Sequence, residues 1–324
     1  MKKIISAIIV LVMITSLFSG CSGTTQENNG KLSIVTTVFP EYDWVMNILG
    51  EKAADADVTM LLDNGVDLHS FQPTADDIIK ISNCDLFIYI GGESDEWVED
   101  ALKTVKNENM ISLNLMQLLG ERVKEEEEVE GMQAEEEHAD EEAEEKEYDE
   151  HIWLSLKNAS GACGIITDAL CEADEKNAEN YKANSLEYTV KLNALDEQYE
   201  KAVKNASKKT VLFGDRFPFR YLFDDYGLEY FAAFKGCSAE SEASFETISF
   251  LAKKTDELGL NYVMTLEGTD GKIAETVIEN TKNKNAKILS MNSMQSITAS
   301  DVENNASYLD ITEKNLEVLK TALS

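Results

Sequence analysis

The sequence predicts an α/β protein with two parallel-sheet lobes joined by one long rigid helix. Two series of short apolar, β-branched runs alternate with helix-like segments, and a stretch without Pro or Gly separates the two series. Such alternation is typical of parallel sheets whose crossover connections are helices. The chain has 324 residues, which is long enough for two such lobes with a substantial hydrophobic core.

Eight segments have the composition of buried strands. They lie at residues 32–38, 58–62, 86–90 and 110–113 in the first series, and at residues 210–213, 229–234, 262–266 and 287–291 in the second. We therefore expect an N-terminal lobe at residues 31–173 and a C-terminal lobe at residues 207–324.

Residues 174–206 form the predicted link between the lobes. Apolar residues recur there at spacings of three and four, at Tyr188, Leu192, Leu195, Tyr199 and Val203. This pattern predicts one amphipathic helix, and about 30 residues at 1.5 Å per residue span on the order of 45 Å. A helix of this length acts as a strut, so we expect the lobes to move little relative to each other.

The N-terminus has the anatomy of a bacterial lipoprotein signal. Two lysines precede an apolar stretch at residues 4–18, and a small-residue cleavage site ends at Cys21. We predict a signal peptide at residues 1–20, lipid attachment at Cys21 and a flexible polar tether at residues 21–30. The mature protein would then work outside the cytoplasm, lipid-anchored to the bacterial cell membrane. An ordinary secretory signal or an uncleaved anchor is the alternative.

The chain is strongly acidic, with a formal net charge of -32. A phosphate backbone would be repelled, so a nucleic-acid partner is not expected, whereas cations are compatible with this charge. Residues 124–150 contain sixteen Asp or Glu against two Lys. Because they lack apolar periodicity, we expect a solvated, disordered insertion. It is either a solubilising loop or a loose collector of cations, in which His138 is the metal-capturing side chain.

The four cysteines after Cys21 show neither a CxxC pair nor the spacing of a zinc ribbon. Core packing is expected for Cys84, Cys163 and Cys171, and disulfides are not indicated.

Candidate binding residues follow the predicted strands. In open α/β sheets ligands bind beyond the carboxyl ends of the strands. The polar residues at those positions are His69, Asp215, Glu267 and Asn292. His151 lies where the acidic insertion ends. The chain has only three histidines, and two of them face this crevice, so a metal site in the cleft between the lobes is predicted.

Two motifs resemble a known family. Residues 67–74, DLHSFQPT, are similar to the first ligand loop, usually G-x-D-P-H-x-Y-x-P-T, of the solute-binding lipoproteins of bacterial zinc and manganese ABC importers. Residues 149–156, DEHIWLSL, resemble the second ligand loop, D-P-H-x-W-L-D-P. An acidic insertion before the second ligand is characteristic of the family's zinc branch. The resemblance covers nearly the whole mature chain and implies that His69 and His151 are metal ligands.

The third and fourth ligands depart from the family pattern. The family's third His falls at Arg216, whose guanidinium cannot ligate a cation. Asp215 is the nearest replacement, and Arg216 would then orient carboxylates or close the site against larger ions. The fourth position falls at Asn292, for which Glu267 is the alternative carboxylate.

We therefore predict a site of His69, His151, Asp215 and Glu267, with Cys237 and Glu242 as further candidates. Two imidazoles with carboxylates suit tetrahedral Zn²⁺, and also Mn²⁺ at a higher coordination number.

The resemblance implies a monomeric binding protein that captures Zn²⁺ and delivers it to an ABC permease and its ATPase. Mn²⁺ or Fe²⁺ is the alternative cargo. An extracellular zinc metallohydrolase is the enzyme alternative, but the chain lacks HExxH, GxSxG and phosphate-loop motifs. An adhesin or metal chaperone would use the same site with another partner. We expect a carrier and not an enzyme.

Overall fold

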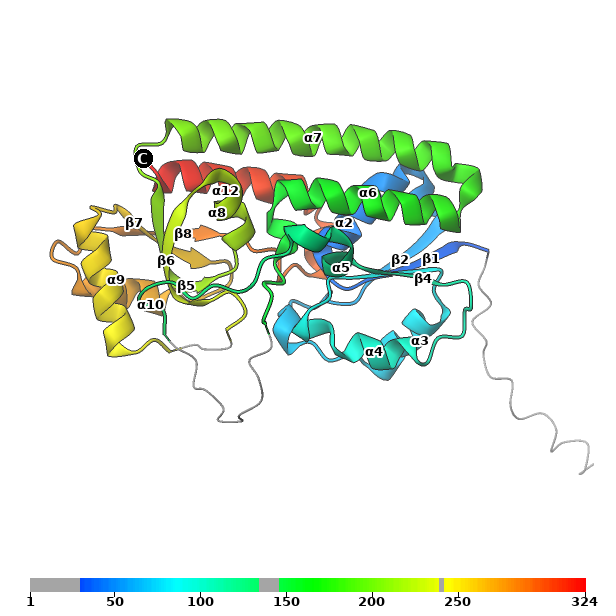
Figure 1. Ribbon diagram of the computed structural model, residues 1–324, viewed down its shortest axis with the longest axis horizontal. Coiled ribbons are helices and arrows are strands. Elements are labelled where there is room, and N and C mark those ends of the chain that lie inside the picture. The colour runs from blue at the N-terminus through cyan, green and yellow to red at the C-terminus, as the bar shows by residue number, and fades with distance from the viewer. Residues whose placement is uncertain (1–29, 134–145, 239–241) are drawn as a thin grey trace, which may run out of the picture. The chain divides into compact units, whose positions relative to one another are not determined.

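Figure 1 shows a computed structural model of the protein, which describes residues 30–133, 146–238 and 242–324. The predicted signal peptide, the lipidation site Cys21 and the capture residue His138 lie outside the described residues. Residues Leu32–Ser324 form one compact unit. None of the described helices is long and apolar enough to cross a bilayer.

Two four-stranded sheets form the frame of this unit, and every strand pair is parallel. The first sheet has the order β2-β1-β3-β4 and the second the order β6-β5-β7-β8. Their bounds are β1 Leu32–Thr36, β2 Ala56–Met60, β3 Leu86–Tyr89, β4 Ile111–Asn114, β5 Thr210–Phe217, β6 Glu229–Lys235, β7 Tyr262–Leu266 and β8 Lys287–Met291. All eight predicted strands are confirmed. The largest difference is at β5, which continues to Phe217 instead of ending at residue 213.

Helices cover the first sheet on both faces (Figure 1). They are α2 Phe39–Leu49, α3 Ala75–Asn83, α4 Trp97–Leu102, α5 Leu115–Leu119 and α6 Leu156–Ala173. The helices α2 and α6 contact each other and the sheet, and α3 contacts β1 and α4.

The second sheet carries the remaining short helices. They are α8 Arg220–Tyr226, α9 Phe245–Glu257, α10 Lys272–Asn280, α11 Ala299–Glu303 and α12 Tyr308–Ala322. The helices α9 and α10 pack together against this sheet, and α12 contacts β8.

The predicted strut is the helix α7, Ala178–Asn205, with 28 residues. Its five predicted apolar positions are all buried. The helix contacts α2 and α6 of the first lobe and α8 and α12 of the second. Hydrogen bonds link it to helices of both lobes: Tyr188 Oη donates to Asp43 Oδ2 in α2 at 3.0 Å, and Tyr199 Oη donates to the Thr312 carbonyl in α12 at 2.7 Å.

The two lobes also share packing beneath this helix. Trp153 Nε1 donates to the Ser293 carbonyl at 2.8 Å, and Tyr308 Oη donates to the Trp153 carbonyl at 2.6 Å. One hydrophobic core cluster includes residues of both lobes. Since close-packed interiors deform little, this shared core favours a rigid pair of lobes.

The described ends of the acidic insertion are ordered, so the expectation of disorder was wrong for residues 124–133 and 146–150. Glu125 and Tyr148 form an antiparallel bridge, and the Gln133 N–H donates to the Ala233 carbonyl at 2.9 Å. Met132 is buried. The physical reason lies in β6, an edge strand whose free backbone groups offer hydrogen bonds to a neighbouring segment. The composition of the insertion could not reveal this docking.

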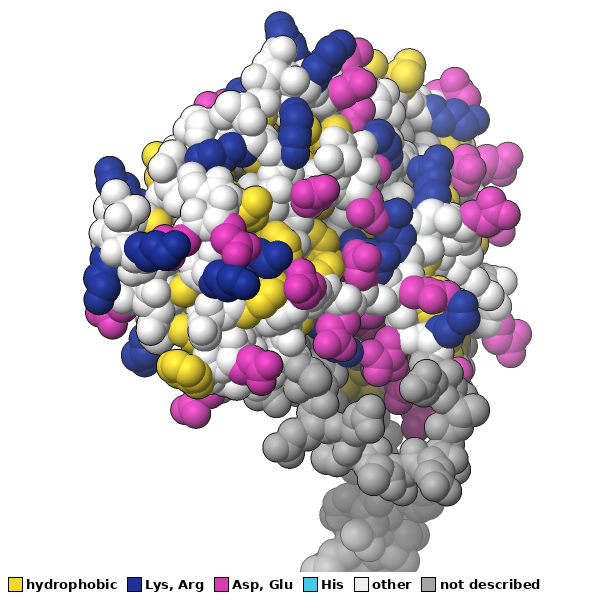
Figure 2. Space-filling view, turned by 60° about the vertical axis from the view of Figure 1, so that its left-hand side comes forward, with side chains coloured by type: hydrophobic (Ala, Val, Ile, Leu, Met, Phe, Trp, Pro, Cys, Tyr) yellow, Lys and Arg dark blue, Asp and Glu magenta, His cyan; other side chains and the backbone are white. Residues whose placement is uncertain are grey.

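Charged side chains of both signs share the described surface. Figure 2 shows one face, on which Lys and Arg side chains are interspersed with Asp and Glu. Cys84 and Cys163 are buried in the core, Cys171 is half-buried, and all three are free thiols.

Candidate metal centre

His69 lies in a short turn that follows β2. The turn is a 3₁₀ helix, Leu68–Ser70, and the carboxylate of Asp67 caps it by accepting the His69 N–H at 3.1 Å. His69 Nδ1 lies 2.7 Å from Ser94 Oγ, whose own proton goes to Glu150. The serine oxygen therefore accepts from Nδ1, and this leaves Nε2 with its lone pair.

His151 is fully buried and immediately precedes the 3₁₀ turn Ile152–Leu154. Its Nδ1 lies 2.9 Å from Asp149 Oδ1, and the same oxygen accepts the His151 N–H at 2.8 Å. A carboxylate on Nδ1 fixes the tautomer in which Nε2 is free to bind a metal.

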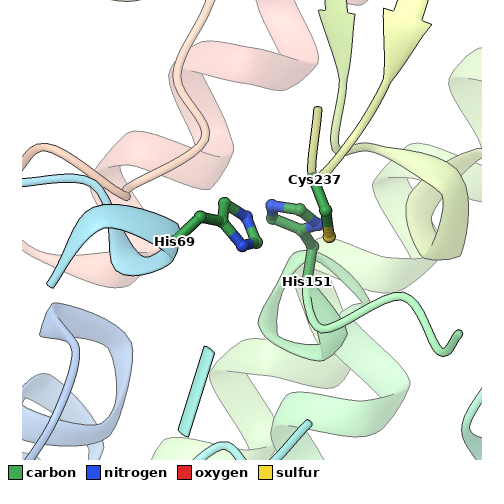
Figure 3. Close-up of side chains that lie close together, drawn as sticks. All are labelled: His69, His151 and Cys237. Carbon is green, nitrogen blue, oxygen red and sulfur yellow. The ribbon is translucent and has the colours of Figure 1, made fainter. Parts of the chain in front are cut away.

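The structure brings His69 and His151 together with Cys237 (Figure 3). One nitrogen of each imidazole and the Cys237 sulfur all lie within 4.8 Å of one another. The two rings are tilted by 58°, with centroids 5.4 Å apart. Both Nε2 atoms are buried and have no hydrogen-bond partner among the described residues. Buried polar atoms are normally paired, so these two atoms indicate a ligand that binds between them.

Carboxylates surround this cluster and suit it to a cation. Burial opposes charge on His151, but Asp149, Glu150 and Glu126 raise its pKa above the ordinary value. Burial likewise opposes charge on Glu150, while hydrogen bonds from His69 and Ser94 hold its pKa below the usual range.

The thiol of Cys237 lies among the same carboxylates. Burial raises its pKa, and the nearby carboxylates of Glu126, Asp149 and Glu150 raise it further. A divalent cation would relieve the repulsion among these groups, because it adds the positive charge that the site lacks.

Asp215 is placed elsewhere, by an irregularity in β5. The pairing of β5 with β6 shifts register between Phe213 and Arg216. Asp215 is buried there, and its carboxylate accepts from the Leu266 N–H at 3.1 Å and from Thr269 Oγ1 at 2.9 Å. These bonds tie β5 to the end of β7. The structure does not bring Asp215 into the cluster of His69, His151 and Cys237.

Arg216 faces the loop that carries His69. Its Nη2 donates to Asp67 Oδ2 at 2.8 Å, and its Nη1 donates to the Ser238 carbonyl at 3.3 Å. Burial opposes charge on Asp67, but Arg216 lowers the pKa of this carboxyl below its usual range. The arginine thus orients a carboxylate beside the site, which is one of the two roles expected for it.

Two of the other three candidate oxygen donors, Glu267 and Asn292, are occupied by local bonds. Glu267 accepts the Ser293 N–H and hydroxyl at 2.8 and 2.7 Å, and burial raises the pKa of its carboxyl. Asn292 Oδ1 accepts the Met294 N–H at 2.7 Å. Glu242 lines a pocket of about 640 Å³ that also borders His69 and Arg216. None of these three joins the histidine cluster within the described part of the chain.

A second, smaller pocket of about 220 Å³ lies on another side of His69. Its lining includes Cys237 and four glutamates, Glu93, Glu126, Glu147 and Glu150. Burial, followed by repulsion from Glu147 and Glu150, raises the pKa of the Glu93 carboxyl. A cation that reaches the cluster from this pocket would be attracted by the carboxylates that line it.

Sequence reasoning missed the residues that support the two histidines. Ser94, Glu150 and Glu126 belong to this support, and no motif singled them out. Glu126 lies within a run of four glutamates, so no local signal separates it from its solvated neighbours. Asp149 could have been found, because it stands two residues before a predicted ligand.

Several known proteins resemble this chain over most of its length. The family model "Zinc-uptake complex component A periplasmic" matches residues 34–322. The high-affinity zinc uptake system protein ZnuA of Bacillus subtilis is 31% identical, over 94% of this chain and 92% of its own length. Zinc-binding protein AdcA of Streptococcus pyogenes is 28% identical over 99% of this chain but only 61% of its own length, so the chain spans about three fifths of that relative.

A solved structure has the same fold. The crystal structure of the Zn(II)-bound ZnuA-like domain of Streptococcus pneumoniae AdcA superposes with a TM-score of 0.70 and 25% sequence identity, covering 91% of this chain and 99% of that domain. Because the family model spans nearly the whole described chain, the protein belongs to the family of zinc-uptake complex component A.

Proposed function

We propose that this protein is the extracytoplasmic binding component of an ABC importer, which captures Zn²⁺ between its lobes and delivers it to a permease driven by an ATPase. The observation that carries this proposal is the pair of imidazoles whose Nε2 atoms are both buried. Each holds Nδ1 against a neighbouring oxygen and leaves Nε2 without a partner among the described residues. This is how proteins prepare histidine for zinc.

Zinc is the proposed cargo in preference to Mn²⁺ or Fe²⁺. Imidazole nitrogens favour zinc over manganese in the Irving–Williams order. The relatives reported above carry zinc in their names, and one was solved with Zn(II) bound. The carboxylates around the site supply negative charge without crowding the imidazoles.

The cellular setting follows from the N-terminal sequence. We place a signal peptide at residues 1–20, a lipid anchor at Cys21 and a tether at residues 21–30. The lobes at residues 31–173 and 207–324 would then stand outside the cytoplasm as a monomer, linked by the helix at residues 174–206. The acidic insertion, with His138, would collect cations for the site.

The protein is proposed as a carrier and not as an enzyme. The two imidazoles and Cys237 offer ligand atoms within 4.8 Å of one another, close enough to hold a single ion, and no serine nucleophile motif is present in the sequence. An enzyme would turn over a substrate when loaded, whereas a carrier shows only stoichiometric binding.

Calorimetric titration of the metal-stripped protein tests the proposal. We expect one tight Zn²⁺ site per chain, weaker binding of Mn²⁺, and zinc in the protein as purified. Tight Mn²⁺ binding that zinc cannot displace, or no tight metal binding, would overturn it.

A further inference from the structure

We propose that Cys237 is the third metal ligand of this chain, so that the site is built from two imidazole nitrogens and one thiolate and takes borderline or soft divalent cations. The inference rests on the proposed function and goes further by naming a ligand type and a class of cation. It concerns the position at which this sequence departs from the family pattern, because Arg216 occupies the place of the third His.

The sulfur is already close to both imidazoles. The three donors lie within 4.8 Å of one another, and Figure 3 shows the Cys237 sulfur beside the His151 ring. In a tetrahedral zinc site with Zn–N near 2.0–2.1 Å and Zn–S near 2.3 Å, donor atoms stand about 3.5 Å apart. The donors therefore need to approach by only about 1 Å, which side-chain adjustment can supply.

The backbone before Cys237 is shaped for this approach. Gly236 lies so close to the site that a Cβ on it would stand 3.2 Å from His151 Cε1 and 3.0 Å from the Phe217 carbonyl. Both contacts are tighter than ordinary van der Waals contacts, so a side chain at this position would require its neighbours to shift. Glycine thus lets the chain leaving β6 pass against the imidazole and present the next residue, Cys237, to it.

The carboxylate of Glu126 also holds the segment that carries Cys237. Glu126 Oε1 accepts the Cys237 N–H at 3.2 Å, and Lys235 Nζ lies 3.9 Å from Glu126 Oε2. Glu126 belongs to the ordered base of the acidic insertion. The insertion and the end of β6 therefore meet at Cys237, which also lines the small acidic pocket through which a cation can reach it.

The competing third ligands are bonded elsewhere. Asp215 is bound to the end of β7, and Glu267 to Ser293. Arg216 is bound to Asp67 and cannot ligate. Among the described residues, Cys237 is the candidate that the structure joins to both histidines.

A thiolate changes which ions the site prefers. Thiolates select Zn²⁺ and softer ions such as Cd²⁺, while Mn²⁺ prefers oxygen donors. A site of two imidazoles and a thiolate therefore discriminates against Mn²⁺ more strongly than one in which a carboxylate is the third ligand.

Optical titration with Co²⁺ tests the assignment directly, because a cobalt–thiolate bond produces a charge-transfer band in the near ultraviolet that imidazole and carboxylate do not. We expect this band at one Co²⁺ per chain in the wild type. It should persist in Cys171→Ser, a matched control at a half-buried cysteine on α6, and disappear in Cys237→Ser. Zinc affinity should fall at least tenfold in Cys237→Ser and stay unchanged in Cys171→Ser.

The outcomes separate this inference from the proposed function. Stoichiometric Co²⁺ binding by the wild type without the band, or a band that survives in Cys237→Ser, would overturn the cysteine ligand and leave zinc capture standing. Absence of tight Co²⁺ and Zn²⁺ binding by the wild type would overturn both. The band of the wild type can be measured even if Cys237→Ser fails to fold, so the inference stays testable without this variant. In that case we expect bound Zn²⁺ to protect the Cys237 thiol of the wild type from an alkylating reagent. An alkylation rate that is the same with and without Zn²⁺ would refute the cysteine ligand.

Discussion

Arg216 Nη2 donates to Asp67 Oδ2 at 2.8 Å, and this ion pair joins β5 of the C-terminal lobe to the loop that presents His69. The other oxygen of Asp67 caps the turn that holds this histidine. Arg216, which stands where the family resemblance predicts a third His, thus holds the His69 loop in place from the opposite lobe.

Arg216→Met should therefore weaken zinc binding by about tenfold, the lower end of the range for residues that orient metal ligands. Arg216→Lys should have an intermediate effect, because an ammonium lacks the fork that reaches both Asp67 and the Ser238 carbonyl. Calorimetric zinc affinities measure both variants. Arg122→Met, at an exposed arginine that donates to the Lys157 carbonyl, is the control. Equal affinity in Arg216→Met and Arg122→Met would show that the ion pair does not position His69.

Asp149→Asn should lower zinc affinity by about 10- to 100-fold. The substitution keeps the shape of the side chain but removes the charge that orients His151 Nδ1 at 2.9 Å. Asp100→Asn, at an exposed carboxylate paired with Lys103, should leave the affinity unchanged. A wild-type affinity in Asp149→Asn would contradict the assigned role of this carboxylate.

Two deletions distinguish the contribution of the middle of the acidic insertion from that of its ends. Deleting residues 134–145 should leave thermal stability and the tight zinc site intact, because it spares Glu126 and the Gln133 bond to β6. Deleting residues 125–147 removes both contacts and should lower the melting temperature and the zinc affinity together. Thermal unfolding and zinc titration of the two proteins distinguish these results. Equal melting temperatures and equal zinc affinities of the two deletion proteins would mean that the described ends of the insertion contribute neither to stability nor to zinc binding.

Glu41 should make the metal-free protein less stable as the pH rises. Its carboxyl is fully buried, and burial, aided by Asp95, raises its pKa from 4.5 to about 8. Between these values the unfolded chain releases the proton while the folded protein keeps it, so the free energy of unfolding falls as pH increases from about 4.5 to about 8.

Glu41→Gln mimics the protonated carboxyl and should be more stable than the wild type near pH 8, by on the order of a few kcal/mol, with the advantage fading toward pH 4.5. Urea unfolding at both pH values measures the difference. Glu121→Gln, on an exposed turn, should show no such pH dependence. A stability difference between Glu41→Gln and wild type that is the same at both pH values would refute the argument.

The sequence predicted those features that depend on local pattern. Alternating apolar runs located all eight strands, and the spacing of Tyr188 through Val203 located the strut helix. His69 and His151 were found because both stand in loops beside recognisable motifs, and the structure places them next to each other.

The remaining donors depended on tertiary structure. Asp215 was expected just after a strand, but β5 continues to Phe217 with an irregular register that turns this carboxylate toward Leu266. Cys237 could be named only as one of several candidates, because nothing in its neighbourhood predicts that β6 delivers it to His151. The role of Glu126 was hidden by the glutamates on either side of it.

The most direct test of zinc capture compares the zinc affinity of His69→Ala and His151→Ala with the wild type, by competition against a chelator of known affinity. Each substitution should weaken binding by at least tenfold, about 1.4 kcal/mol, whereas His138→Ala should retain the tight site. Wild-type affinity in both His69→Ala and His151→Ala would contradict the central claim that these two imidazoles hold the transported ion.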